Sequence, residues 1–283
     1  MKVRASVEAI TTADLPAVAQ FLHDHLARER SPAEWLTALQ THWQGERPNH
    51  GYMLREEGRV VGTICALYAQ RVIKGQTLAT CNITSWCVLD SHRAQSMKLA
   101  MAVVKQPGFH FTDFSPTATV GGVLRFLKFK PLPEAQTVVF SVPSPGLGSR
   151  LLSDAKDIEA ALSGEALQIY RDHQRFPWLR HVLLGSPAGW CHVIFKPMQF
   201  KGLPAVKVLY LSAPPLFRKH LGRWCTHLLG QGIVTSHVEC RFLPDRPWHS
   251  AVRTGFNAKV YLSDSLGDDD IDYLYSETMA MDL

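Results

Sequence analysis

The sequence predicts an α/β protein made of two similar halves, each a mixed and mostly antiparallel twisted sheet flanked by helices. Short apolar runs typical of strands are joined by tight turn signals, and they alternate with apolar residues at helical spacing. The same order of hairpin, strand, loop, helix and strand occurs twice, on either side of a Pro-, Gly- and Ser-rich linker at 144–149. We therefore expect a diverged duplication with domains at 1–143 and 144–283.

The composition is that of a globular protein with a sizeable core. Of the 283 residues, 46% are hydrophobic and 19% are charged, which suits one large or two ordinary domains. The net charge of +5 suits an anionic ligand, although an ordinary basic protein has the same balance. No cluster of Lys and Arg with interleaved aromatic residues occurs, so we expect no nucleic-acid partner.

The cysteines and the N-terminal sequence indicate a reducing, cytoplasmic location. The six cysteines lie mostly in apolar runs without a CxxC pair, where a free thiol behaves as a small hydrophobic group. Cys225-x-His227 and His237-x-x-Cys240 do not place their ligands on one face of a helix or strand, so we expect no metal. The N-terminus lacks the apolar region of a signal peptide, and no run approaches the roughly 18 apolar residues of a membrane span.

In the first half, alternation and turn signals predict the strands, and capping signals predict the helices. Glu57-Gly58 and Lys74-Gly75 are each typical of a hairpin turn, and the run from Ser31 to Glu34 is a capping box with proline at the first helical position. We expect strands at 4–10, 51–55, 59–69, 77–89, 109–114 and 138–142. We expect helices at 15–26, 32–43, 97–104 and 119–127.

The second half repeats much of this order. Its turn at Lys201-Gly202 matches Lys74-Gly75 and lies at the corresponding place in the repeat. We expect helices at 158–162, 166–175 and 216–229. We expect strands at 190–195, 205–212, 234–242 and 258–262.

The stretch from Asn82 to Val104 is the strongest functional signal. It combines an apolar strand at 83–89, a polar loop at 90–96 and a helix with apolar residues at helical spacing. The first turn of a helix has unpaired backbone N–H groups and the positive end of the helix dipole, so it can bind phosphate. Arg93 in the loop can add a charge-assisted contact, although it also fits a simple surface charge.

Taken with the elements around it, this stretch resembles the GNAT superfamily of acyl-CoA-dependent acyltransferases, over roughly residues 3–132. The family's loop, Arg/Gln-x-x-Gly-x-Gly/Ala, binds the CoA pyrophosphate through backbone amides. The matching residues here are Arg93, Ala94, Gln95, Ser96, Met97 and Lys98. The resemblance further implies that the end of the preceding strand pairs with the pantetheine arm, which here means Cys87, Val88 and Leu89. It also implies the Val88 N–H as donor to the thioester oxyanion.

The resemblance places the acceptor site at the end of the next strand. We expect Asp113 as the proton acceptor, with His110 and then His92 as second choices, and Ser115 beside it. Asp113 also fits a turn-capping aspartate before Ser-Pro, and His110 fits an ordinary strand residue. Trp86 and Asn82 are candidates for lining the acceptor cleft, although either also fits a structural role.

The resemblance implies transfer of an acyl group, typically acetyl, from acyl-CoA to an amine of a small molecule or protein in one direct step. Two alternatives remain open. A catalytically weakened acyl-CoA-binding or scaffold protein fits the departures from the family pattern, because Ser96 and Lys98 replace the loop glycines and Leu124 replaces the family's acidic tyrosine. The second alternative is acylation of a hydroxyl group on a saccharide precursor. The loop at 218–223 fits the motif poorly, so we expect the active site in the first half and a degenerate second copy.

Overall fold

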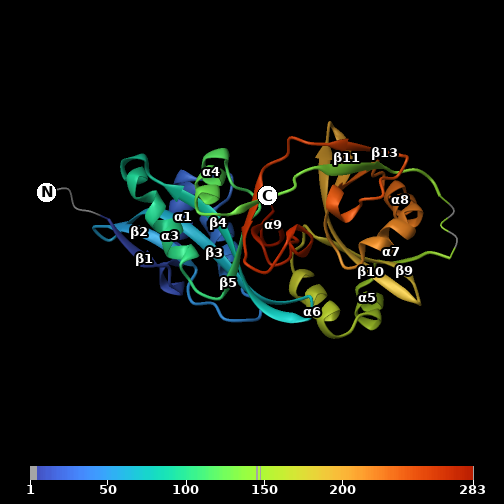
Figure 1. Cartoon of the computed structure of the whole chain (residues 1–283), viewed down its shortest axis with the longest axis horizontal. Helices are drawn as coiled ribbons and strands as arrows, with labels where there is room; N and C mark the ends of the chain where they lie inside the picture. Colours follow the sequence, from blue (N-terminus) through green and yellow to red (C-terminus); the bar gives the residue numbers. More distant parts are fainter. Residues whose placement is uncertain (1–4, 145, 147, 283) are drawn as a thin grey trace. The chain divides into compact units, whose positions relative to one another are not determined.

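The computed structural model describes residues 5–144, 146 and 148–282, and it contains two seven-stranded mixed sheets with helices, as expected (Figure 1). The chain divides into two compact units. The first unit contains the chain up to Leu132, together with Asn257–Gly267 and the segment from Tyr275 onward. The second unit contains Pro133–Phe256 and Asp268–Leu274.

The sheet of the first unit has the order β1-β2-β3-β4-β5-β14-β6. All of its neighbouring strands are antiparallel except β4 and β5, which run parallel. The strands are β1 Ser6–Ala9, β2 Gly51–Glu56, β3 Arg59–Ile73, β4 Gln76–Val88, β5 Phe109–Asp113, β6 Lys130–Leu132 and β14 Lys259–Leu262. The first of these lies within the strand expected at 4–10, of which residue 4 is outside the described residues.

The sheet of the second unit repeats this arrangement in the order β13-β7-β12-β11-β10-β9-β8. Here β11 and β12 are the parallel pair. The strands are β7 Gln136–Phe140, β8 Arg150–Leu152, β9 Arg180–Ser186, β10 Gly189–Phe200, β11 Leu203–Leu211, β12 Thr235–Glu239 and β13 Ser250–Arg253. The common order supports the expected duplication.

Each half of the chain supplies one strand to the other sheet. β7 follows β6 in the sequence but pairs with β12 and β13, whereas β14 returns to lie between β5 and β6. The boundary expected at 143/144 therefore does not match the compact units, because the first unit ends at Leu132 and recovers two later segments. Within the expected linker at 144–149, residues 145 and 147 lie outside the described residues.

The helices follow the capping and spacing signals closely. The capping box of Ser31 and Glu34 is present at the start of α2, with Pro32 as its first residue. The first unit contains α1 Leu15–His25, α2 Pro32–Gln40, α3 Ser96–Val104, α4 Ala118–Phe126 and α9 Glu277–Ala280. The second unit contains α5 Ala155–Ala161, α6 Gly164–His173, α7 Pro214–Lys219 and α8 Leu221–Leu229. The helix expected at 216–229 is thus interrupted at His220, and β12 stops three residues before the expected Phe242.

Each sheet has its own apolar core. In the first unit, Leu99, Ala100 and Val103 of α3 pack on sheet residues that include Ile64 and Ile83. In the second unit, a separate cluster is centred on Trp224 of α8, whose ring lies edge-on to Phe195 of β10. The core of the first unit fixes the start of α3 next to the end of β4, which is where the candidate site lies.

Candidate functional site

The two parallel strands of the first sheet part halfway along β4. They pair only from Ala79 to Asn82 on β4 and from Phe109 to Thr112 on β5. β4 continues to Val88, whereas β5 ends at Asp113. The second half of β4 therefore has β3 on one side and none of the described strands on the other, which leaves a strand edge open to a ligand.

A β-bulge lies at the start of this open edge. The register between β3 and β4 passes from Thr63–Cys87 to Cys65–Thr84, so two residues of β4, Ser85 and Trp86, face one residue of β3. Ser85 has a φ of 52°, which is a left-handed conformation that costs energy for a residue other than glycine. Such bulges bend a strand and re-aim its side chains, and they occur often next to active sites.

The Val88 N–H points towards the open side. The Leu89 N–H donates to the Val61 carbonyl oxygen at 3.0 Å, so it faces β3. Successive amides of a strand face opposite sides, and the Val88 N–H therefore faces away from β3. The Val88 N–H thus has the direction that the resemblance to the GNAT family requires of the oxyanion donor.

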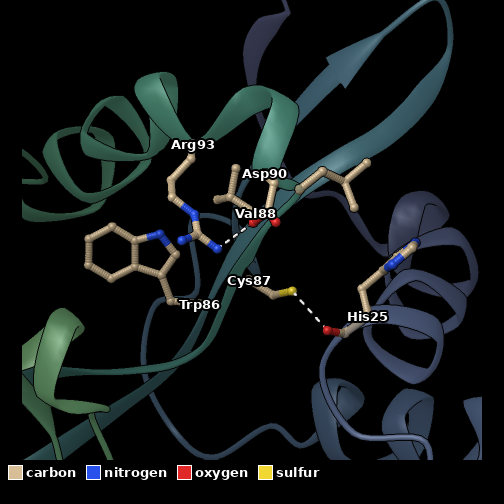
Figure 2. Close-up of a pocket in the computed structure, with 7 residues that line it drawn as sticks. His25, Trp86, Cys87, Val88, Asp90 and Arg93 are labelled. Atoms are coloured by element: carbon tan, nitrogen blue, oxygen red, sulfur yellow. Dashed lines mark hydrogen bonds and ion pairs between the residues drawn. The ribbon is translucent and has the colours of Figure 1, made fainter.

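A pocket of about 410 Å³ lies at the end of β4, and we call it the loop pocket (Figure 2). It brings together four of the residues expected to bind CoA, namely Cys87, Val88, Leu89 and Arg93. The other lining residues are His25, Trp86 and Asp90. The Cys87 thiol donates to the His25 carbonyl oxygen at 3.6 Å, and burial raises the pKa of this thiol. A raised pKa favours the neutral thiol, so the environment of Cys87 does not activate it as a nucleophile.

Arg93 crosses the loop pocket between Trp86 and Asp90 in the view of Figure 2 and pairs with the Asp90 carboxylate. Both side chains are largely exposed, at 74% and 87%. An exposed ion pair of this kind contributes about 0–1 kcal/mol, so a bound phosphate can compete with it. Asp90 nevertheless places a negative charge in the pocket that the sequence interpretation did not consider.

The rest of the expected phosphate loop leads directly into α3. The 3-10 helix η2 covers Asp90–Gln95 and runs directly into α3, which begins at Ser96. No side chain caps α3, but the Ser96 N–H already donates to the Arg93 carbonyl oxygen. The Lys98 ammonium donates to the Gln95 side-chain oxygen at 3.4 Å. Ala94 and Met97 are exposed. None of the residues from 94 to 98 lines the loop pocket itself, and α3 begins three residues after Arg93.

A second pocket of about 250 Å³ lies further back along β4, and we call it the Asp113 pocket. Trp86 lines both pockets. The polar lining residues of the Asp113 pocket are Asp113, Ser115, Thr84, Ser85 and Thr117, and the others are Leu26, Ala27, Trp35, Trp86, Pro116, Val120 and Met281. The indole nitrogens of Trp35 and Trp86 have no hydrogen-bond partner among the described residues. The lining thus contains one carboxyl group, four hydroxyl groups and two indole side chains in a mainly apolar wall.

The Asp113 carboxyl group is only 4% exposed and belongs to a buried acidic cluster. It accepts a hydrogen bond from the Ser115 N–H at 3.1 Å. The Ser115 hydroxyl in turn donates to Glu277 at 2.9 Å. Burial, and then the negative charge of Glu277, raise the pKa of Asp113 well above its ordinary value. Burial also raises the pKa of Glu277, against the lowering effect of its hydrogen bonds.

Two candidate residues lie elsewhere. Asn82 is 3% exposed; its amide donates to the Thr112 hydroxyl at 3.2 Å, and its oxygen accepts from the Glu277 N–H at 2.8 Å. His110 shares a 2.8 Å hydrogen bond with the Ser263 hydroxyl, and it lies an odd number of residues from Asp113, on the other face of β5. Neither lines the loop pocket or the Asp113 pocket.

His92, the further choice for a proton acceptor, also lies outside both pockets. Its ring pairs with the Glu56 carboxylate at 3.0 Å. Residues that the sequence interpretation missed are Trp35, Glu277 and Met281. Trp35 lies in the helix expected at 32–43 and carries no functional signal of its own, and the two C-terminal residues have no local signal that connects them with β4 or β5.

The comparisons with solved structures identify the fold. A GCN5-related N-acetyltransferase from Anabaena variabilis superimposes with a TM-score of 0.62 at 10% identity, covering 91% of this chain and 72% of that one. A protein of unknown function from Enterococcus faecalis, described as a probable N-acyltransferase, gives 0.60 at 11% identity, covering 91% and 71%. Eis1 from Mycobacterium abscessus gives 0.55 at 11% identity, covering 90% and 73%.

These similarities confirm the GNAT resemblance at the level of the fold, over about nine-tenths of the chain. No family model matches the sequence, and no curated protein matches it. None of the helices in the described part of the chain is long and apolar enough to cross a membrane. Residues 5–144, 146 and 148–282 contain no group of three or more His, Cys, Asp and Glu side chains placed to bind a metal.

Proposed function

We propose that this protein transfers an acyl group from acyl-CoA to an amine in one direct step. The observation that carries the proposal is the open edge of β4, which runs from the Asp113 pocket through Val88 to the loop of Arg93 and the start of α3. One continuous strand edge therefore joins a place for an amine, an oxyanion donor and a place for a phosphate. The fold of known N-acetyltransferases supports this use of the edge.

The residues divide the work as follows. The edge from Cys87 to Leu89 binds the pantetheine amides, and Arg93 and Lys98 with the first turn of α3 bind the pyrophosphate. The amine nitrogen attacks the thioester carbonyl carbon, the Val88 N–H stabilises the oxyanion, and the C–S bond then breaks. Asp113 takes the proton that the nitrogen loses.

No protein acid is required for the leaving sulfur. Leu124, which stands at the position of the family's tyrosine, is fully buried in the core and offers no proton. A free thiol has a pKa of about 8.5, so water can protonate the departing thiolate near neutral pH. The missing tyrosine therefore removes one contribution to rate without excluding the reaction.

The Asp113 pocket favours an amine over a saccharide hydroxyl. Its wall contains Leu26, Val120 and Met281 besides two indole rings, and none of its lining residues is cationic. A buried carboxyl group attracts an ammonium, and the apolar wall suits a small organic amine. A saccharide hydroxyl can bond to the serine and threonine side chains of this wall, but only an ammonium gains from the charge of Asp113.

Thermal shift with CoA, acetyl-CoA and longer acyl-CoAs tests the binding step, because a ligand that binds the folded state raises its melting temperature. We expect these ligands to raise the melting temperature of the parent protein. Arg93→Ala should weaken their binding about tenfold, since charge-assisted hydrogen bonds contribute about 1.5–3 kcal/mol. Arg59→Ala, an exposed arginine outside both pockets, is the matched control. Absence of any shift contradicts the proposal.

Release of free thiol with a panel of small amines then separates an enzyme from a binding protein. We expect thiol release that depends on the amine and is absent in Asp113→Asn. Stabilisation by acyl-CoA without amine-dependent release for any member of the panel would favour the acyl-CoA-binding or scaffold alternative.

A further inference from the structure

The C-terminal segment of the first unit carries a carboxyl group to the point where β4 and β5 part. Glu277 begins α9 and is fully buried. Its N–H donates to the Asn82 side-chain oxygen at 2.8 Å. Its Oε1 accepts from the Phe114 N–H at 3.1 Å and from the Ser115 hydroxyl at 2.9 Å. Glu277 therefore contacts β4, through Asn82, and the two residues that follow Asp113.

The second oxygen of Glu277 has no such partner. Oε2 is buried and accepts no hydrogen bond from the described residues. Leaving a charged oxygen buried and unpaired is costly, so a structural role alone does not account for an acid at this position. Glutamine would form the same Oε1 contacts without the charge.

The charged groups around this oxygen increase the cost further. From β4, β5 and the residues after β5, the groups that act on the two carboxyls are Asn82, Asp113, Ser115 and the Phe114 amide. Of these described groups only Asp113 is ionisable, and it carries the same sign of charge as Glu277. Two carboxyl groups that share a buried site without a cation cannot both ionise, and they titrate as a pair.

We propose that Glu277 is a positioning residue for the transfer: it shares one proton with Asp113 and so sets the pH at which Asp113 accepts the proton of the acceptor amine. This inference rests on the proposed function. The pair begins with one proton and one negative charge, which holds an ammonium in the pocket. The bound ammonium first loses one proton to water, which leaves the neutral amine. The amine nitrogen then attacks, its second proton moves to Asp113, the pair becomes neutral, and that proton later leaves to water. Ser115 links the two carboxyls and fixes their mutual position.

The test is Glu277→Gln, because the amide oxygen still accepts from the Phe114 N–H and the Ser115 hydroxyl while the charge is removed. We expect the acid limb of kcat/KM against pH to move down by about one pH unit or more, since Asp113 then ionises more easily. A merely structural role would lower activity without moving this limb. Glu29→Gln, an exposed acid of the same unit, should leave the profile unchanged.

A second measurement does not depend on activity. A carboxyl group with a raised pKa in the folded state stabilises the protein at low pH, and this stability is lost as the pH rises through the folded pKa. As the pH rises through the folded pKa of the pair, the melting temperature of the parent protein should therefore fall more than that of Glu277→Gln. If no amine is acylated but Glu277→Gln still flattens the stability profile, the proposed function is wrong and the shared proton stands. If the stability profile of Glu277→Gln matches that of the parent, the inference is wrong whatever the activity.

Discussion

The two sheets part their parallel strands in the same way, but the helices that follow the parting strands begin differently. In the second sheet, β11 and β12 pair from Ala205–Lys207 to Thr235–His237, and β11 then continues to Leu211. A register shift on β10 opposite this part of β11 matches the bulge of the first sheet. The helix that follows begins with Pro214 and Pro215, which have no backbone N–H. The second copy therefore lacks two of the amides with which a helix start binds phosphate.

The buried acids at the two parting points also differ. Glu239, at the end of β12, is 2% exposed and is neutralised by Arg241, whose Nε donates to it at 2.6 Å. Tyr273 donates to its other oxygen at 2.6 Å. Arg241 also donates to the carbonyls of Asp268 and Ile271. Here an acid anchors a later chain segment and is paired with a cation, whereas hydrogen bonds, and no cation among the described groups that act on them, accompany Asp113 and Glu277. The comparison teaches that a buried acid paired with a cation indicates a structural anchor, and an unpaired one indicates a site.

The largest expected effect is a difference in the free energy of unfolding between variants at these two kinds of acid. Arg241→Met leaves Glu239 buried without its cation, and removal of one partner of a buried ion pair costs about 3–5 kcal/mol. Asp113→Asn removes one of two like charges and keeps an acceptor for the Ser115 N–H, so the free energy of unfolding should stay level or rise. Chemical denaturation of both variants against the parent checks this. A destabilised Asp113→Asn with an unaffected Arg241→Met would reverse the assignment of structural and functional acid.

The second prediction concerns pH, for which the two units should respond in opposite directions. The second unit contains a buried histidine pair, with His181 Nδ1 and His192 Nε2 3.1 Å apart. Burial lowers the pKa of His181 to about 4 and, together with the charge of His181, that of His192 to about 3. Since the unfolded value is about 6.5, stability is complete above pH 6.5 and is lost as the pH falls towards 4 and 3.

His192→Phe should weaken this acid loss. Each unit of pKa shift corresponds to about 1.4 kcal/mol, so we expect the variant to avoid a loss of a few kcal/mol near pH 4 relative to pH 7. Phenylalanine preserves the packing against Tyr170 and Tyr210. The measurement is the melting temperature between pH 4 and 7.5, with His249→Asn of the same unit as control. If the melting temperature of the variant falls at low pH as much as that of the parent, the pair does not govern acid sensitivity.

Signals carried by neighbouring residues predicted the structure correctly. The capping box at Ser31 and the turn at Glu57-Gly58 depend on neighbouring residues, and the structure contains both. Arg93 and the end of β4 also lie together in one pocket, because they are adjacent in the chain. Prediction failed where contacts are distant. β14 gives no local sign that it enters the first sheet, and Glu277 reaches Asn82 across 195 positions.

Some failures have other physical causes. β6, β8 and β13 are only three or four residues long, so periodicity cannot reveal them. His110 shares a strand with Asp113, but the alternation of a strand sends the two side chains to opposite faces. Asn82 was a candidate for the acceptor cleft, with a structural role as the alternative, and its amide is used by Thr112 and Glu277.

The smallest expected effect concerns the loop of the first unit. Asp90 lines the loop pocket and holds Arg93 in an exposed ion pair, so a bound pyrophosphate must displace one negative charge with another. Asp90→Asn removes that competitor, and we expect acyl-CoA to bind a few times more tightly, in keeping with the 0–1 kcal/mol or so of an exposed pair. The gain should shrink at high salt, where such charges are screened. Isothermal titration at two ionic strengths measures it, with Asp264→Asn, an exposed acid outside the pocket, as control. Weaker binding in Asp90→Asn would mean that the aspartate holds Arg93 in the orientation that binds the ligand. An oriented Arg93 would then compensate for the missing loop glycines.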